Sequence, residues 1–209
     1  MTIVLINQSI YSQKKIVGKV EFYKSNNLND RIFQSTTDVE LEKINSNNHS
    51  IKVIQGKVVD STKTDDNGIF KFNFNVSNML DIVVNENSTV LEGRFHFKPN
   101  VIIENDTLLL KISDKKIAVY KDSISAKGFY SKYNEKKALE HFKQGKRQLL
   151  AIGGEMSKLK RKEQQKLTKN HDVKFNYVLF GSLMSRAKLR ILERYNSKMK
   201  ELLGIKNVW

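Results

Sequence analysis

Residues 57–76, KVVDSTKTDDNGIFKFNFNV, predict two β-strands on either side of a tight turn. If the D-N-G at its centre forms a three-residue loop with Gly68 in the left-handed region, Thr64 faces Phe70 and the two strands pair as a hairpin. Phenylalanine then recurs at every second position of the second strand, so one face of that strand is aromatic and the other is polar. The stretch therefore predicts an antiparallel sheet with one buried face.

The acidic turn also invites comparison with a calcium loop. An EF-hand loop places acidic oxygens at its first, third and fifth positions, glycine at its sixth and glutamate at its twelfth. With Gly68 as the sixth residue, Lys63 takes the first position and Phe74 the last. A cation and a phenyl ring cannot coordinate calcium, so we interpret the acidic residues as turn formers and expect no metal site and no cofactor.

Short segments rich in β-branched and aromatic residues fill the first 125 residues, with Asn, Asp, Ser and Gly between them. Strands at this spacing are typical of a sandwich or barrel. We expect this region to have its own core, centred on Phe70, Phe72, Phe74, Phe95 and Phe97. The expected strands are 3–6, 15–23, 38–44, 51–59, 69–76, 80–84, 89–97, 101–104, 107–112 and 116–120.

Three of these segments together resemble a known family. They are GKVEF (18–22), DVELEKI (38–44) and TKTDDNGIFKFNF (62–74). Over roughly residues 16–76 the chain resembles the carboxypeptidase-regulatory-like, transthyretin-like β-sandwich, in which a hairpin with a T-D-x-x-G-x-F-x-F pattern follows two strands. The proline and glycine often found between the first strands of that family are missing here. The resemblance implies a non-catalytic domain, often an adhesive or spacer domain.

The pattern becomes helical from about residue 126. Asn134 is placed to cap a helix over 135–144, and a second, poorly apolar helix is expected over 155–169. The segment 174–203 has apolar residues three and four apart along one stripe, which predicts a third helix. Gly204 followed by an isoleucine fits a glycine-terminated helix end. The stripe comprises Phe175, Val178, Leu179, Met184, Ala187, Ile191, Tyr195, Met199 and Leu202.

Charge divides the chain in the same place as the periodicity does. Residues 1–125 carry 16 Lys and Arg against 15 Asp and Glu, whereas residues 126–209 carry 21 against 7. We therefore predict an α+β protein: an N-terminal all-β sandwich module over 1–125, then a basic C-terminal α-helical module over 126–209. Residues 121–134 are the expected connector. A positive excess of this size indicates a polyanionic partner, although a lysine-rich solvated surface would give the same count.

Two groups of cations are the candidate contacts for nucleic acid. One crowds the second predicted helix, and the other recurs every four residues along the third, so that it forms an edge able to follow a phosphate backbone. The alternative is a solvated flank whose long side chains cover the apolar stripe. The candidates are Lys158, Lys160, Arg161, Lys162, Lys166, Lys169, Arg186, Arg190, Arg194 and Lys198.

Catalytic motifs fail on individual residues. KPNVIIENDTLLLKI (98–112) has the outline of a metal-dependent nuclease hairpin, but Asn100 and Leu109 stand where two carboxylates must hold the metal. QGKR (144–147) lacks the glycine and the Ser or Thr of a phosphate-binding loop. The histidines at 49, 96, 141 and 171 are far apart in the sequence. We therefore expect no enzyme, and a degenerate nuclease is the last alternative.

These observations favour a structural subunit of a large nucleic-acid-containing assembly. A phage virion protein of the head, neck or connector is the leading interpretation. The alternatives are a ribosomal or organellar-ribosomal protein and a free-standing, sequence-independent nucleic-acid-binding accessory protein. The expected partners are other protein subunits, in an oligomer, and nucleic acid. MTIVLINQSI has no signal-peptide pattern and no window is apolar enough for a membrane span, so the expected location is a virion or the cytoplasm.

Overall fold

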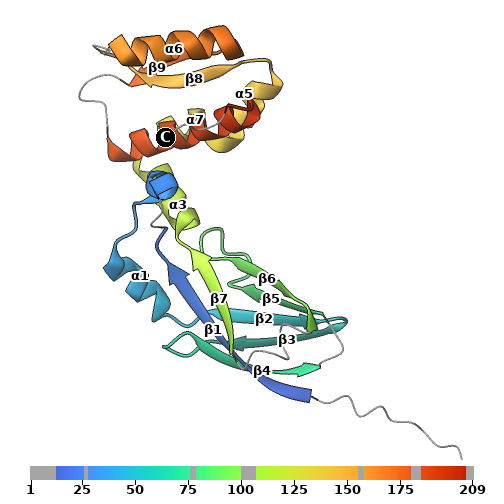
Figure 1. Cartoon of the computed structure of the whole chain (residues 1–209). Coiled ribbons are helices and arrows are strands. Elements are labelled where there is room, and N and C mark those ends of the chain that lie inside the picture. The colour runs from blue at the N-terminus through green and yellow to red at the C-terminus, as the bar shows by residue number, and fades with distance from the viewer. Residues whose placement is uncertain are drawn as a thin grey trace, which may run out of the picture. The chain divides into compact units, whose positions relative to one another are not determined.

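A computed structural model describes residues 13–25, 28–75, 79–99, 107–154, 158–179 and 185–205. The chain forms two compact units, one from residues 1–25 and 36–117 and the other from 26–35 and 118–209. The division lies eight residues before the predicted boundary at 125/126. It also assigns the early segment 26–35 to the second unit, which no sequence signal indicates. The α+β class is as predicted (Figure 1).

Among its described residues, the first unit contains two sheets and the short helix α1. One sheet has the order β4-β1-β7, formed by β4 (Ile69–Asn75), β1 (Gln13–Tyr23) and β7 (Thr107–Ser113), with β1 antiparallel to β4 and parallel to β7. The other is antiparallel with the order β3-β2-β5-β6. Its strands are β3 (Val58–Lys63), β2 (Ser50–Gln55), β5 (Leu80–Val84) and β6 (Gly93–Phe97).

One hydrophobic core joins the two sheets. Side chains from both contribute to it, among them Ile16, Phe70 and Leu110 from the first sheet, and Ile51 and Ile82 from the second. Phe72 is buried in this core, and Phe95 and Phe97 pack against it. The side chain of Phe74 lies outside the described residues, as do the strands expected at 3–6 and 101–104.

The predicted turn at Gly68 is confirmed, but the predicted pairing of the two flanking strands is wrong. Gly68 has a φ of 75°, as expected of a left-handed turn residue. The chain then leaves the second sheet, so that β4 pairs with β1 and not with β3. Gly18 of β1 lies opposite Phe70, and a Cβ on Gly18 would come within 2.1 Å of that ring. Because Gly18 has no side chain, the Phe70 ring can pack directly against β1.

Two expected strands are helices. Residues 38–44 lie in α1 (Asp38–Asn45), because Thr37 and Glu40 form a capping box: the Thr37 hydroxyl accepts from the Glu40 N–H at 3.2 Å, and the Glu40 carboxylate accepts from the Thr37 N–H at 2.7 Å. Residues 116–120 lie in α3 (Lys115–Ser125). The segment expected as one strand over 51–59 is the pair β2 and β3, with a turn at Gly56.

The second unit is not all-helical. Its strands β8 (Gln148–Ile152) and β9 (Lys174–Leu179) form a parallel pair, connected through α6 (Lys158–His171). β9 contains the first part of the stripe expected to be helical over 174–203, and α7 (Arg186–Leu202) contains the part from Ala187 onward. Met184 lies outside the described residues. α6 lies on one face of the pair, and α5 (Glu135–Lys143) and α7 lie on the other (Figure 1).

Helix ends in this unit follow the sequence signals closely. Asn134 caps α5 by accepting from the Lys137 N–H at 2.9 Å. At the end of α7, Gly204 has a φ of 67°, and the N–H groups of Gly204 and Ile205 donate to the carbonyls of Glu201 and Lys200. This is the expected glycine-terminated end.

The expected connector at 121–134 is helical instead. It contains the last turn of α3 and α4 (Lys127–Lys132), and the 3₁₀ helix η1 (Leu28–Phe33) belongs to the same unit. The core of the unit collects Ala138 from α5, Leu149 from β8, Leu179 from β9 and Tyr195 from α7.

Candidate nucleic-acid interface

α6 presents lysines on the side that faces away from the sheet. Its inner side is marked by Leu167, which packs against the core, and by Gln164, whose side-chain oxygen accepts from the Tyr177 hydroxyl of β9 at 3.0 Å. At 3.6 residues per turn, Lys162, Lys166 and Lys169 lie roughly opposite these two residues.

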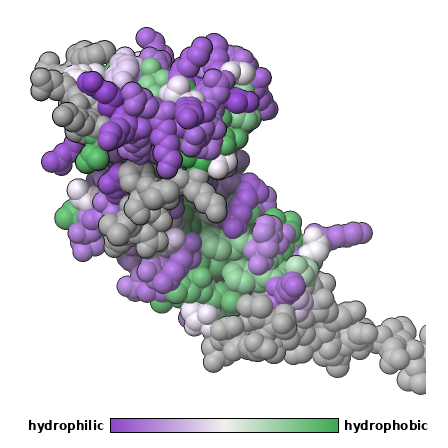
Figure 2. All heavy atoms as spheres, turned by 45° about the horizontal axis from the view of Figure 1, so that its top comes forward, coloured by the Kyte–Doolittle hydropathy of each residue, from purple (hydrophilic) through white to green (hydrophobic). Residues whose placement is uncertain are grey.

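All three of these lysines are exposed. We call them the α6 lysine face. A largely hydrophilic surface covers this part of the second unit (Figure 2).

The remaining predicted residues of α6 are placed differently. Lys160 and Arg161 are exposed in the first turn but do not share the outer face. Lys158 begins the helix, and its side chain lies outside the described residues. Glu163 is the only carboxylate among the fourteen residues of α6, so the helix keeps a strong positive charge.

The arginines of α7 do not form the free edge that their spacing predicts. Arg186 is exposed at the start of the helix, but the side chain of Arg190 is 19% exposed and that of Arg194 only 2%. Lys198 is paired with Glu201. The four-residue spacing correctly places these residues along one side of α7, but two of them face the interior of the unit.

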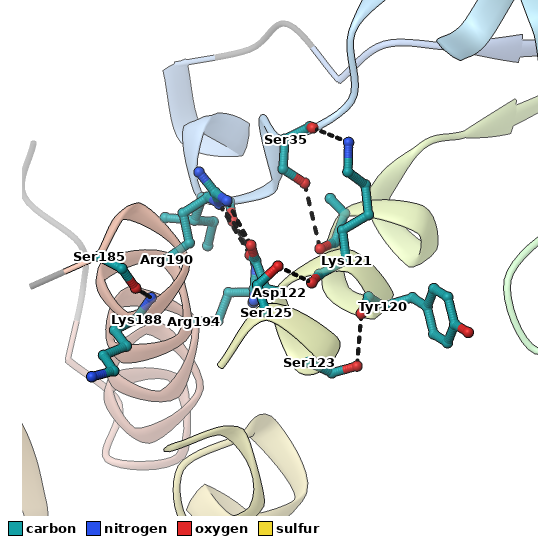
Figure 3. A network of polar contacts seen from close by, with 12 residues as sticks. Ser35, Tyr120, Lys121, Asp122, Ser123, Ser125, Ser185, Lys188, Arg190 and Arg194 are labelled. Atoms are coloured by element: carbon teal, nitrogen blue, oxygen red, sulfur yellow. Dashed lines mark hydrogen bonds and ion pairs between the residues drawn. The ribbon is translucent and has the colours of Figure 1, made fainter. Parts of the chain in front are cut away.

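A buried carboxylate explains this. Asp122 of α3 is 1% exposed and accepts three hydrogen bonds from Arg190: Nε donates to Oδ1 at 3.2 Å and to Oδ2 at 3.0 Å, and Nη2 donates to Oδ1 at 2.5 Å (Figure 3). Arg194 Nη1 lies 2.8 Å from Oδ2 of the same carboxylate and also donates to the Ile32 carbonyl at 2.7 Å. The Phe33 ring lies 5.7 Å from the Arg194 guanidinium carbon.

This arrangement holds η1, α3 and α7 together. Two guanidinium groups share one carboxylate, so the buried cluster has a formal excess of positive charge. Arg194 Nη2 has no hydrogen-bond partner among the described residues. A charge reversal at Arg194 would therefore report on folding and not on nucleic-acid binding.

A second group of cations surrounds a cavity of about 630 Å³ beside β9. Lys127 and Lys132 come from α4 and Lys188 from the first turn of α7, and no carboxylate lines the cavity among the described residues. We call it the β9 groove. The residues around it are Ala126, Lys127, Gly128, Phe129, Lys132, Tyr133, Asn176, Tyr177, Val178 and Lys188.

Sequence reasoning missed these lysines. They come from two separate segments, α4 and the first turn of α7, and no spacing in the sequence connects the two. Only the packing of α4 and α7 beside β9 brings them together.

One buried polar cluster combines histidine and tyrosine. The Tyr195 hydroxyl lies 2.8 Å from His141 Nδ1 and accepts from Gln148 Nε2 at 3.0 Å. Burial raises the pKa of Tyr195, and burial with two nearby lysines lowers the pKa of His141. When His141 is neutral, its Nδ1 can accept a hydrogen bond from the Tyr195 hydroxyl. Each of His141, Tyr195 and Gln148 then has a hydrogen-bond partner. Tyr195 is fully buried, so this cluster connects α5, β8 and α7 and does not face a ligand.

The described part of the chain shows neither a metal-ligand cluster nor a membrane-spanning helix. Its histidines and carboxylates include no group of three or more that could hold a metal ion. Among those residues, no helix is long and apolar enough to cross a membrane. No protein-family model matches the chain, and no curated protein matches it. The α6 lysine face and the β9 groove are therefore the candidate functional surfaces.

Proposed function

We propose that this chain is a non-enzymatic subunit of a large nucleic-acid-containing assembly, in which the α6 lysine face contacts the phosphate backbone. The observation that carries the proposal is the position of Lys162, Lys166 and Lys169 on one exposed helix face, opposite the residues that pack on the sheet. Lysines placed in this way can neutralise successive phosphates.

The binding we propose is independent of nucleotide sequence. The face consists of flexible cations without the aromatic or amide side chains that read base edges. A phage virion, a ribosome and a free nucleic-acid-binding protein would all use the same phosphate contacts. Copurification of the native protein with a particle supports the subunit, whereas a strictly monomeric protein that never joins one favours the accessory protein.

The test compares two triple variants with the same change in charge. Lys162→Gln, Lys166→Gln and Lys169→Gln together remove the α6 lysine face. Lys57→Gln, Lys63→Gln and Lys71→Gln remove three exposed lysines of the first unit. Affinity for duplex DNA and for RNA is measured for the full chain across a salt series, since counterion release determines how steeply affinity falls with salt.

The slope of log affinity against log salt should become shallower by about 1 for each lysine that contacts a phosphate, or about 3 for the first variant. The second variant should keep the native slope. If both variants weaken binding equally, net charge and not the α6 lysine face is responsible, and the proposal fails.

A further inference from the structure

The two edges of the β8–β9 sheet differ in whether their backbone groups have hydrogen-bond partners in the described residues. At the outer edge of β8, Asn196 of α7 contacts both backbone groups of Leu150: its Oδ1 accepts from the N–H at 2.7 Å, and its Nδ2 donates to the carbonyl at 2.8 Å. A neighbouring strand would bond one residue in the same two ways. The Asn196 side chain therefore closes this edge.

The edge of β9 has no such cover in the described residues. The Lys174 N–H donates to the Arg147 carbonyl at 2.8 Å, on the β8 side. Backbone groups of a strand alternate in direction, so the N–H and C=O of Phe175 and Tyr177 point away from β8. No described strand pairs with β9 on that side. Parallel sheets are rarely left so narrow, and unpaired edges readily accept another strand.

The β9 groove lies along this open edge. Asn176, Tyr177 and Val178 all line it, although consecutive side chains of a regular strand point to opposite faces, and the pairing with β8 skips Val178 at the end of this stretch. Three successive residues can border one cavity when the cavity lies beside the strand. The groove volume of about 630 Å³ is within the range of sites that accept ligands.

We propose that the open edge of β9 binds an extended, acidic segment of a partner protein. The segment adds a strand by pairing with the backbone of Phe175 and Tyr177, and its carboxylates contact Lys127, Lys132 and Lys188. Charge decides between occupants, because a second copy of this chain would bring the same lysines against themselves. The site is separate from the α6 lysine face and does not depend on nucleic-acid binding there.

Amide exchange in the full-length protein tests the pairing directly. The probe is a peptide of alternating valine and glutamate, and its control has lysine in place of glutamate. On binding, exchange at the Phe175 and Tyr177 amides should slow at least about tenfold, as an exposed amide becomes hydrogen-bonded. The amide of Asn176, which faces β8, should change little and acts as an internal control.

Charge-reversal variants test the groove lysines. Lys127→Glu, Lys132→Glu and Lys188→Glu together should weaken binding of the valine–glutamate peptide by about tenfold or more, as expected for three partly exposed ion pairs. The matched control reverses Lys136, Lys143 and Lys146, which are no part of the lining, and it should bind within about twofold of the native protein. The exchange experiment on the native chain needs neither variant to fold.

Three results would overturn the proposal. The first is the absence of slowed exchange at Phe175 and Tyr177 with the acidic peptide. The second is the same protection from single-stranded oligothymidylate but not from the peptide, which would assign the groove to nucleic acid. The third is protection that rises with protein concentration alone, which would assign the edge to a second copy of the chain.

Discussion

Replacing Asp122 with alanine should destabilise the second unit strongly. Among the described residues, the Asp122 carboxylate is the only anionic group that pairs with Arg194, and the Arg194 side chain is 2% exposed. Arg190 is 19% exposed, so its guanidinium can turn toward water when the carboxylate is lost. Arg194 cannot, and would remain as a buried charge held only by the Ile32 carbonyl and the Phe33 ring.

The expected cost follows from that difference in burial. Removing one partner of a buried ion pair costs about 3–5 kcal/mol, most of it the penalty of the uncompensated charge. Asp122→Ala should therefore lower the free energy of unfolding of the second unit by about this amount. Arg190→Ala should cost less, because Asp122 keeps Arg194. Combining Asp122→Leu with Arg194→Met removes both charges and should recover most of the loss.

Urea unfolding followed by methyl NMR separates the two units. The Met199 methyl group is buried in the core of the second unit and Ile82 in the core of the first, so each reports on its own unit. The Met199 transition should move to lower urea in Asp122→Ala, while the Ile82 transition stays in place. A loss below about 1 kcal/mol, or one no larger than that of Arg190→Ala, would refute the reasoning that Arg194 depends on this carboxylate.

Two further predictions concern the first unit and its controls. Gly18→Ala should lower the free energy of unfolding by about 1–3 kcal/mol, because the new methyl group meets the buried Phe70 ring. Gly128→Ala, in α4 of the second unit with nothing within 4 Å of the added Cβ, should be neutral or stabilising by up to about 1 kcal/mol. An Ile82 transition that stays at the native urea midpoint in Gly18→Ala would contradict the steric argument. Burial lowers the pKa of His49, which accepts at Nδ1 from Asn85 and donates from Nε2 to the Ile44 carbonyl. The unfolded chain therefore takes up a proton more readily, so stability should fall as pH drops below about 6.5, and NMR titration of the His49 ring should give a pKa below that value; a pKa at or above it would contradict the prediction.

Local chemistry in the sequence correctly predicted several features. The cap at Asn134, the end of α7 at Gly204, the left-handed Gly68 and the alternating phenylalanines of β4 all depend on residues close in the chain. The α+β class follows from two regions with different periodicity. These signals act over a few residues, so no tertiary contact is needed to read them.

Errors arose where short apolar segments fit both periods. Residues 38–44 alternate like a strand, yet the capping box at Thr37 makes them helical, and Val39 is 74% exposed as a result. The apolar stripe predicted over 174–203 belongs to a strand and a helix and not to one helix. Apolar residues three and four apart also occur by chance across the boundary between two elements.

The sequence by itself determined the charge excess of the second unit, the turn and helix-end residues, and which side chains are apolar. Only the tertiary structure decided which of the cations face water. Arg194 and Lys162 are both basic residues on amphipathic helices, but Asp122 comes from a segment 72 residues away from Arg194 to bury one of them, while the outer side of α6 leaves the other in solvent. The groove lysines and the edge of β9 have the same origin. A hydrogen bond or ion pair between distant segments depends on how the chain packs, and neither composition nor periodicity records that.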